Sequence, residues 1–166
     1  YTLTDHIENG RILATGAASL AGNALDNLLE AGTGNNRLDG AGGNDTVSYL
    51  YAVSGSGVSV SLAILGAQAT GGSGSDTLAG IENLTGSTYD DRLTGDANVN
   101  RLSGAQGNDT LDGGAGADSL IGGDGSDSYF VDDIGDVVTE TNANAATGGI
   151  DQVLSTLAAC TLGAHV

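Results

Sequence analysis

The sequence predicts an all-β fold in which short turns and short strands repeat along the chain as a parallel β-solenoid. Three observations support this fold class: a nine-residue period, 29 glycines among 166 residues, and an excess of aspartate over glutamate of 17 to 4. Average glycine usage is about 7%, and this chain has more than twice that share. The short Asp side chain bonds to nearby backbone groups and therefore favours turns over helices.

The nine-residue period is clearest at Gly71–Ala79, which reads GGSGSDTLA. Asp76 occupies its sixth position and Leu78 its eighth. The same frame then runs five times without a gap over residues 86–130. The sixth position of these five frames carries Asp91, Asn100, Asp109, Asp118 and Asp127. The eighth position carries Leu93, Leu102, Leu111, Leu120 and Tyr129.

A degenerate array of the same kind covers residues 22–48. Its frames open at Gly22, Ala31 and Gly40. The sixth positions hold Asn27, Asn36 and Asp45, and the eighth positions hold Leu29, Leu38 and Val47. The presence of two arrays indicates that most of the chain follows one building plan.

Each frame is interpreted as a six-residue turn followed by a three-residue strand. Glycine supplies the positive φ angles that a tight turn needs, and the apolar eighth residue points into the interior. Two frames complete one coil, so turns eighteen residues apart are stacked. We expect Asp91, Asp109 and Asp127 along one edge and Asn100 with Asp118 along the other. Asp76 is expected on the edge of Asn100.

The arrays resemble the RTX (repeats-in-toxin) calcium-binding β-roll of bacterial proteins exported by type I secretion, strongly over residues 71–130 and moderately over 22–48. The resemblance implies calcium ions between turns eighteen residues apart, held by sixth-position side chains and by turn carbonyls. The sixth-position candidates are Asp45, Asp76, Asp91, Asn100, Asp109, Asp118 and Asp127. The remaining candidate metal residues belong to the last three turns: Gly104, Gln106, Asn108, Gly113, Ala115, Ala117, Gly122, Asp124 and Ser126.

The charge balance independently favours calcium, because 21 acidic residues face four arginines and no lysine, for a net charge of −17. Calcium takes six to eight oxygen ligands from carboxylates and carbonyls. Zinc is disfavoured, since one cysteine and two distant histidines do not supply its usual ligands. Asn27, Asn36 and Asn100 lack a charge, so their sites are expected to be weak or vacant. The side chains of Asp96, Asp112 and Asp124 are expected to face solvent.

The segments outside the arrays are expected to belong to the same single β-roll domain, residues 1–166. Residues 49–70 alternate as two strands around a turn and predict an enlarged coil. Residues 80–85 are interpreted as an insertion that lengthens one strand segment. Residues 131–166 predict a strand-containing cap, with an additional metal site among its acidic residues Asp132, Asp133, Asp136, Glu140 and Asp151.

The two ends of the chain resemble each other. Residues 1–7 (YTLTDHI) align with residues 160–166 (CTLGAHV) at three identical positions and one Ile/Val pair. This favours the hypothesis that the chain is one unit of a longer tandem array, with neighbouring repeat units as partners. The recurring His6 and His165 then have a packing role, and Cys160 is interpreted as a small buried residue.

The preferred function is a calcium-triggered folding and spacer module of a secreted or bacterial cell-surface protein. The alternative is a carbohydrate- or surface-binding module that uses exposed Tyr49, Tyr51 and Tyr89. A nucleic-acid partner is excluded because basic clusters are missing. No apolar run reaches the roughly 18 to 20 residues that span a bilayer. No catalytic motif occurs in the sequence, so an enzyme is not expected.

Overall fold

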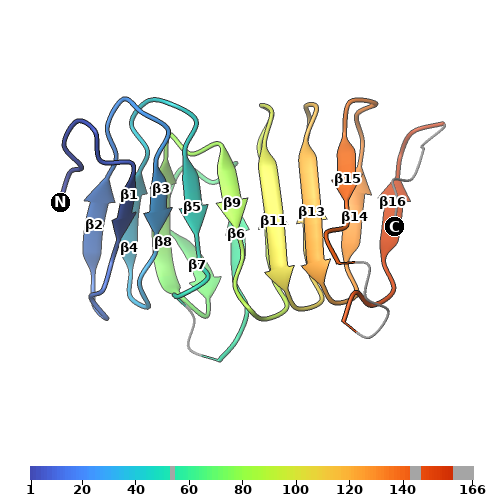
Figure 1. Ribbon diagram of the computed structural model, residues 1–166, viewed down its shortest axis with the longest axis horizontal. Coiled ribbons are helices and arrows are strands. Elements are labelled where there is room, and N and C mark those ends of the chain that lie inside the picture. The colour runs from blue at the N-terminus through green and yellow to red at the C-terminus, as the bar shows by residue number, and fades with distance from the viewer. Residues whose placement is uncertain (53–54, 143–146, 159–166) are drawn as a thin grey trace.

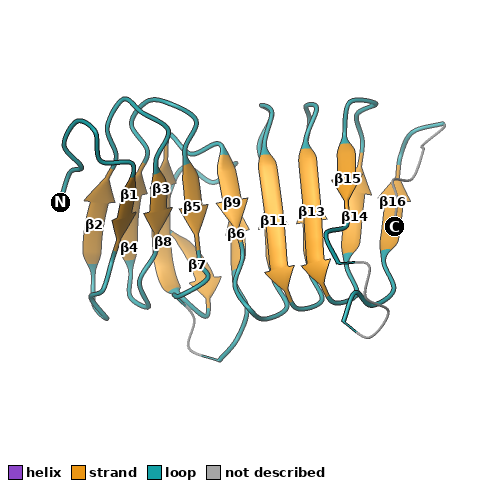
Figure 2. Cartoon of the chain, in the orientation of Figure 1, coloured by secondary structure: helices purple, strands orange, loops and turns teal. Residues whose placement is uncertain are grey.

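A computed structural model describes residues 1–52, 55–142 and 147–158, and its regular secondary structure in these stretches consists of sixteen strands (Figures 1 and 2). In chain order they are β1 Asn9–Arg11, β2 Ala18–Ala21, β3 Leu28–Glu30, β4 Asn36–Asp39, β5 Thr46–Ser48, β6 Ser59–Ser61, β7 Gln68–Gly71, β8 Gly74–Ala79, β9 Asn83–Thr85, β10 Arg92–Thr94, β11 Arg101–Gln106, β12 Thr110–Asp112, β13 Ser119–Asp124, β14 Ser128–Val131, β15 Val137–Thr139 and β16 Gln152–Ser155. Across these residues, no helix has the length and apolar character of a membrane span.

The strands form two faces of a coil whose axis is the long axis of the molecule (Figure 1). One face is a seven-stranded sheet in the order β1-β3-β5-β9-β11-β13-β15. The other face holds a four-stranded sheet, β2-β4-β8-β7, and a five-stranded sheet, β16-β14-β12-β10-β6. Every pairing between these strands is parallel except β7 with β8. The all-β, parallel solenoid fold is therefore confirmed.

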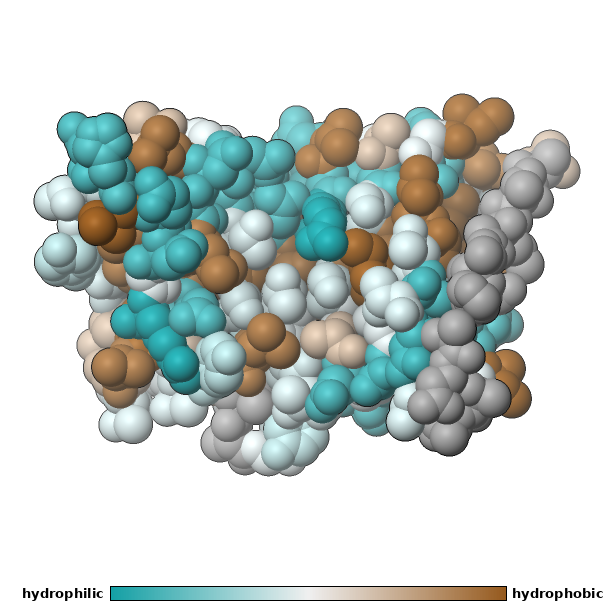
Figure 3. All heavy atoms as spheres, in the orientation of Figure 1, coloured by the Kyte–Doolittle hydropathy of each residue, from teal (hydrophilic) through white to brown (hydrophobic). Residues whose placement is uncertain are grey.

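The pairing register confirms the eighteen-residue coil in the main array. Leu102 lies opposite Leu120 in the seven-stranded sheet, and Leu93 lies opposite Leu111 on the other face. The eighth-position side chains point inward and form two apolar ladders. Leu78 is 5% exposed, and the other eight are fully buried: Leu29, Leu38, Val47, Leu93, Leu102, Leu111, Leu120 and Tyr129. Figure 3 shows the surface of one side, where hydrophobic residues form separate patches among hydrophilic ones.

Residues 80–85 differ from their expected role. They do not lengthen a strand but form a short half-coil of their own, with strand β9 in the seven-stranded sheet and Leu84 buried in the core. Because this half-coil is one additional passage along the seven-stranded sheet, the chain crosses to that face and back between Asp76 and Asp91. Asp76 therefore lies on the face of Asp91 and not on that of Asn100, so the expected edge for Asp76 was wrong.

The segment 49–70 also departs in part from expectation. Strand β6 confirms the second of the two expected strands, whereas residues 49–52 lie in a turn and Val53 is outside the described residues. Strand β7 then pairs antiparallel with β8. Gly71 and Gly74, with φ of 72° and 91°, flank the two residues between these strands, and such angles permit a tight hairpin.

The tail contains β15 and β16, which continue the two faces in parallel register and confirm its expected strands. Residues 160–166, including Cys160 and His165, lie outside the described residues. The hypothesis of a repeated terminal segment therefore stays a prediction.

Candidate metal sites in the turns

The register arranges the sixth-position residues in columns along the two edges of the coil. Asp91, Asp109 and Asp127 follow one another on one edge, and Asp151 continues the column. Asn100, Asp118 and then Asp136 follow one another on the other edge. The expected stacking of residues eighteen apart is present in both columns.

A ladder of hydrogen bonds connects the members of each column. The backbone N–H of Asp91 donates to Oδ1 of Asp109 at 2.8 Å, and the N–H of Asp109 donates to Oδ1 of Asp127 at 2.7 Å. On the opposite edge, the N–H of Asn100 donates to Oδ1 of Asp118 at 2.8 Å. Each of these Asp residues thus uses one carboxylate oxygen to bond the coil before it.

The second carboxylate oxygen distinguishes two kinds of turn. In four turns, Oδ2 of the sixth-position Asp is buried and has no hydrogen-bond partner within the described chain: Asp45, Asp109, Asp118 and Asp127. These Asp residues are at most 1% exposed. A buried carboxylate oxygen without a partner is costly unless a cation meets it. We call these four the open turns.

The backbone of the open turns has a shared geometry. Their second residues are all in the left-handed region: Ala41 at φ 73°, Ala105 at 84°, Gly114 at 78° and Gly123 at 119°. Their first residue is always glycine, and a Cβ there would collide with the sixth-position Asp, as at Gly104 with Asp109. In these turns the second residue does not donate its N–H to Oδ2.

In four other turns the backbone N–H of the second residue donates to a side-chain oxygen of the sixth residue, and we call these the closed turns. Three of them have asparagine at the sixth position. The N–H groups of Asn23, Gly32 and Asp96 donate to Oδ1 of Asn27, Asn36 and Asn100 at 2.7, 2.8 and 2.7 Å. None of these second residues has a positive φ.

Two of the asparagine turns also place an amide nitrogen against carbonyls of the coil before. Nδ2 of Asn100 donates to the Glu82 carbonyl at 2.9 Å. Nδ2 of Asn27 donates to the carbonyls of Ile7 and Glu8, both at 3.3 Å. In these turns an N–H group satisfies oxygens that a cation would otherwise meet.

Asp91 belongs to the closed turns although it is an aspartate. The backbone N–H of Ser87 donates to Oδ2 of Asp91, and the Ser87 hydroxyl donates to Oδ1 at 2.8 Å. The N–H of Val58 donates to the same Oδ1 at 2.6 Å. Sequence reasoning missed Ser87. A serine at the second position of the frame is the feature of the sequence that could have identified it.

Burial and mutual repulsion act on these carboxylates. Burial raises the pKa of Asp109 to about 8, and the charges of Asp91 and Asp127 contribute to the rise. Burial likewise raises the pKa of Asp45 and of Asp127 to about 6. Within the part of the chain that the structure describes, the single ion pair joins Arg37 and Asp39 at the surface. Among the described residues, no basic side chain therefore forms an ion pair with an open-turn carboxylate.

The other candidate residues lie in the same turns with different surroundings. Gln106 and Asp124 are partners in the ladder between β11 and β13. Oδ1 of Asn108 accepts the Ser126 N–H at 2.8 Å. The carbonyls of Gly104 and Gly113 lie close to the α-carbons of Gly86 and Gly95, one coil earlier. Ala115 and Ala117 are exposed, and Gly122 opens the turn of Asp127.

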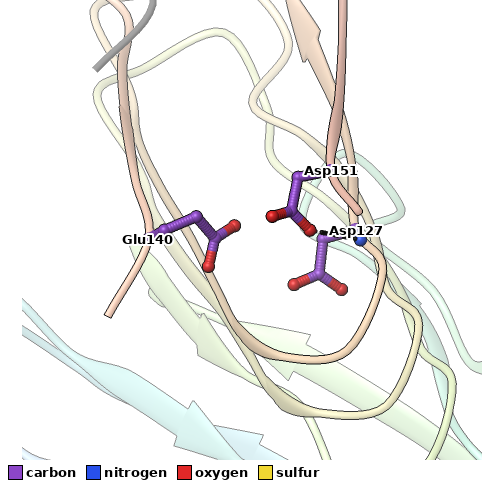
Figure 4. A group of neighbouring side chains, drawn as sticks. All are labelled: Asp127, Glu140 and Asp151. Carbon is purple, nitrogen blue, oxygen red and sulfur yellow. Dashed lines mark hydrogen bonds between the residues drawn. The ribbon is translucent and has the colours of Figure 1, made fainter. Parts of the chain in front are cut away.

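The acidic residues of the tail divide into two groups instead of forming one site. Oδ1 of Asp136 accepts the Asp118 N–H at 3.0 Å, and its Oδ2 accepts the N–H groups of Asp132 and Asp133. Glu140 and Asp151 instead lie with Asp127, and ligand oxygens of these three are all within 4.8 Å of one another (Figure 4). Burial and the charges of Asp151 and Asp127 raise the pKa of Glu140 to about 7.

The open turns fit calcium in their donor chemistry. They offer carboxylate oxygens that are buried, uncompensated and without partners, which are hard ligands of the kind that calcium takes. Asp45, Asp109, Asp118 and Asp127 would hold the ions, which would supply the positive charge that the turns lack. The fold and these turns define a metal-binding β-solenoid.

Comparison with known proteins agrees with this class. The family model of the RTX calcium-binding nonapeptide repeat matches residues 21–49, 78–111 and 94–129, in four copies. The chain belongs to this family, and it is a calcium-binding repeat module. A search of curated proteins found no match.

The tyrosines expected on the surface are not equivalent. Tyr49 is fully buried, so the expectation of an exposed contact residue was wrong there. Tyr51 is 56% exposed, and the Arg11 guanidinium carbon lies 3.8 Å from the centre of its ring. Tyr89 is 41% exposed. The inward position of Tyr49 removes one of the three aromatic residues from any sugar-binding platform.

Proposed function

We propose that this chain is a calcium-triggered folding and spacer module of a secreted or cell-surface bacterial protein. The observation that carries the proposal is the set of four buried carboxylate oxygens without partners in the open turns. Calcium at these turns couples ion binding to folding, because the turns assemble their ligands only when the coils are stacked. The ordered coil is then the calcium-bound state.

The composition supports the need for an ion. Each half-coil buries one large apolar side chain while it orders up to nine residues, many of them glycine, and ordering glycine costs more entropy than ordering any other residue. The net charge of −17 adds self-repulsion. Bound divalent ions would cancel charge and connect neighbouring coils.

The export context follows from the family resemblance. Low calcium inside the cell would keep the chain unfolded and able to pass through a type I secretion channel, and high external calcium would fold it after export. Strands of both arrays belong to the same seven-stranded sheet. This supports treating residues 1–166 as one β-roll domain and as a rigid spacer.

Circular dichroism during a calcium titration tests the proposal. The chain should be largely unfolded in chelator and should gain β-structure as calcium is added, with magnesium at equal concentration as the control. A chain that is already β-rich in chelator would contradict the proposal. Native mass spectrometry then counts the bound ions, and the open turns predict ions at Asp45, Asp109, Asp118 and Asp127.

A further inference from the structure

The turn of Asp127 differs from the other open turns in what lies above it. Val137 to Thr139 of β15 are in register with Ser119 to Ile121 of β13. The next residue in each strand segment places Glu140 over Gly122, the first residue of the Asp127 turn. In the same register Gly122 lies over Gly104 of the Asp109 turn and Val131 lies over Gly113 of the Asp118 turn. Of these three turns, only that of Asp127 has a carboxylate at this position.

The Glu140 carboxylate reaches into the Asp127 turn. Glu140 is 7% exposed, and its Oε1 accepts the Tyr129 hydroxyl, while its Oε2 accepts the Gly123 N–H at 3.2 Å. A Cβ added to Gly122 would meet the Tyr129 hydroxyl, Asp127 Oδ2 and Glu140 Oε1 together. Three side-chain oxygens therefore converge beside the α-carbon of Gly122.

Asp151 supplies a third carboxylate from the next coil. Its Oδ1 accepts the Asp127 N–H at 2.9 Å. Figure 4 shows the carboxylates of Asp127, Glu140 and Asp151 grouped together from three segments of the chain. Asp127 is 1% exposed, and its Oδ2, which faces this group, has no partner among the described residues. That unpartnered buried oxygen is the observation that points to a ligand.

We propose that Asp127, Glu140 and Asp151 form a calcium site that closes the C-terminal end of the column. Glu140 and Asp151 lie beyond the residues that match the repeat family, which end at 129. The site therefore recruits two carboxylates from the tail to complete the last turn of the array. It rests on the proposed function, because it assumes that the open turn of Asp127 takes an ion.

The ligand charge sets the properties of this site. Three carboxylates bring a formal charge of −3 to this site. Among the described residues, no other open turn gathers three acidic groups within 4.8 Å of one another. Calcium affinity rises with the charge and the rigidity of the ligand set. The cap site is thus the tightest in the molecule, and its ion connects β14, β15 and β16. Filling it would fasten the tail to the array and cover the end of the coil.

Ion counting on the whole chain tests the cap site. At a calcium concentration that fills only the tightest site of the wild-type chain, native mass spectrometry should show that ion lost in Glu140→Gln, in Asp151→Asn and, without further loss, in the double variant. Glu8→Gln, an exposed glutamate near the other end of the coil, is the matched control and should retain all ions. Glu140→Gln should also need about tenfold more calcium for the folding transition.

A second readout uses terbium, which occupies calcium sites and emits when a nearby tyrosine absorbs. Tyr129 donates to Glu140 and should excite an ion at the cap. Tyr129→Phe and Glu140→Gln should lose the same component of terbium emission, while circular dichroism at saturating calcium shows that both remain folded. Unchanged ion counts in both single cap variants would overturn the cap site alone. A wild-type chain that binds no calcium would overturn the cap site and the proposed function together.

Discussion

The early coils around residues 22–39 and the late coils around residues 104–131 share one nine-residue frame but satisfy it differently. In the early coils, Asn27 and Asn36 accept a backbone N–H from their own turn. In the late coils, Asp109, Asp118 and Asp127 retain a buried oxygen without a partner. The difference teaches that one N–H group, donated by the chain itself, can take the place of a cation. The ion requirement is therefore a property of individual turns and not of the repeat as a whole.

The largest expected effect is the loss of a carboxylate from an open turn. Asp118→Ala removes the candidate ion ligand and leaves the Asn100 N–H without its acceptor. An unpaired buried donor costs about 1 to 3 kcal/mol, and the lost ion adds to this. We expect a decrease of several kcal/mol in the free energy of unfolding, measured by urea denaturation in saturating calcium.

Asp132→Ala is the control for this substitution, because Asp132 is exposed in the same half of the molecule. It should leave the free energy of unfolding within about 0.5 kcal/mol of wild type. Equal losses in the two variants would remove the distinction between a turn carboxylate and an ordinary surface charge.

Acidification should weaken calcium binding at the open turns. Burial raises the pKa of Asp109 to about 8 in the ion-free fold, above its unfolded value near 4. Between these values the folded carboxyl holds a proton that calcium must displace, so the apparent affinity of that site falls by up to about tenfold per pH unit. Calorimetric titrations at pH 8 and pH 6 measure this.

The raised pKa of Asp109 means that acidification stabilises the fold without calcium, although it weakens calcium binding. Because the folded pKa lies above the unfolded one, protonation stabilises the ion-free fold, and that stability is lost as pH rises from about 4 to about 8. Asparagine turns contribute nothing to this dependence. Calcium affinity that is equal at pH 8 and pH 6 would show that the raised pKa of Asp109 does not affect ion binding.

Conversion of a closed turn into an acidic one should add an ion. Asn100→Asp replaces the amide that donates to the Glu82 carbonyl with a carboxylate oxygen. We expect one additional calcium by native mass spectrometry and a folding transition that depends more steeply on calcium. Asn98→Asp, in the same turn but exposed, should leave the ion count unchanged. An unchanged count in Asn100→Asp would mean that the closed backbone, and not the amide, excludes the ion.

The smallest effect concerns the left-handed residue of an open turn. Ala105 has a φ of 84°, a conformation that costs a non-glycine residue about 1 kcal/mol. Ala105→Gly should relieve this strain and lower the calcium concentration at the folding midpoint about twofold to threefold, since added flexibility of the unfolded chain offsets part of the gain. Ala115→Gly, where φ is not positive, should shift the midpoint the other way. Shifts of the same sign in both would exclude strain as the cause.

Much of the architecture could be predicted because each frame carries its own signals. The apolar eighth residue and the glycine-rich turn are local features, and eighteen-residue stacking follows from two frames per coil. The half-coil at residues 80–85 could not be predicted in this way, since Glu82 takes the sixth position without a glycine frame before it. The antiparallel pairing of β7 with β8 was missed for a similar reason, as residues 68–70 lie outside the repeated pattern.

The candidate metal sites could likewise be predicted only in part from local sequence features. Sixth-position residues were identified from their spacing, but spacing does not show whether Ser87 satisfies Asp91 or whether Ala105 turns its backbone away from Asp109. Glu140 and Asp151 were recognised as acidic residues of the cap, yet their grouping with Asp127 depends on register across three segments.

The sequence by itself determined the fold class, the nine-residue turn and strand units, the inward apolar ladder and the demand for positive charge. Those properties depend on local backbone preferences and on composition, which every frame repeats. Only the tertiary structure decided which turns are open, on which face Asp76 lies, and which carboxylates meet at the end of the column. These depend on hydrogen bonds between coils and on the φ angle of single residues, and neighbouring coils determine both.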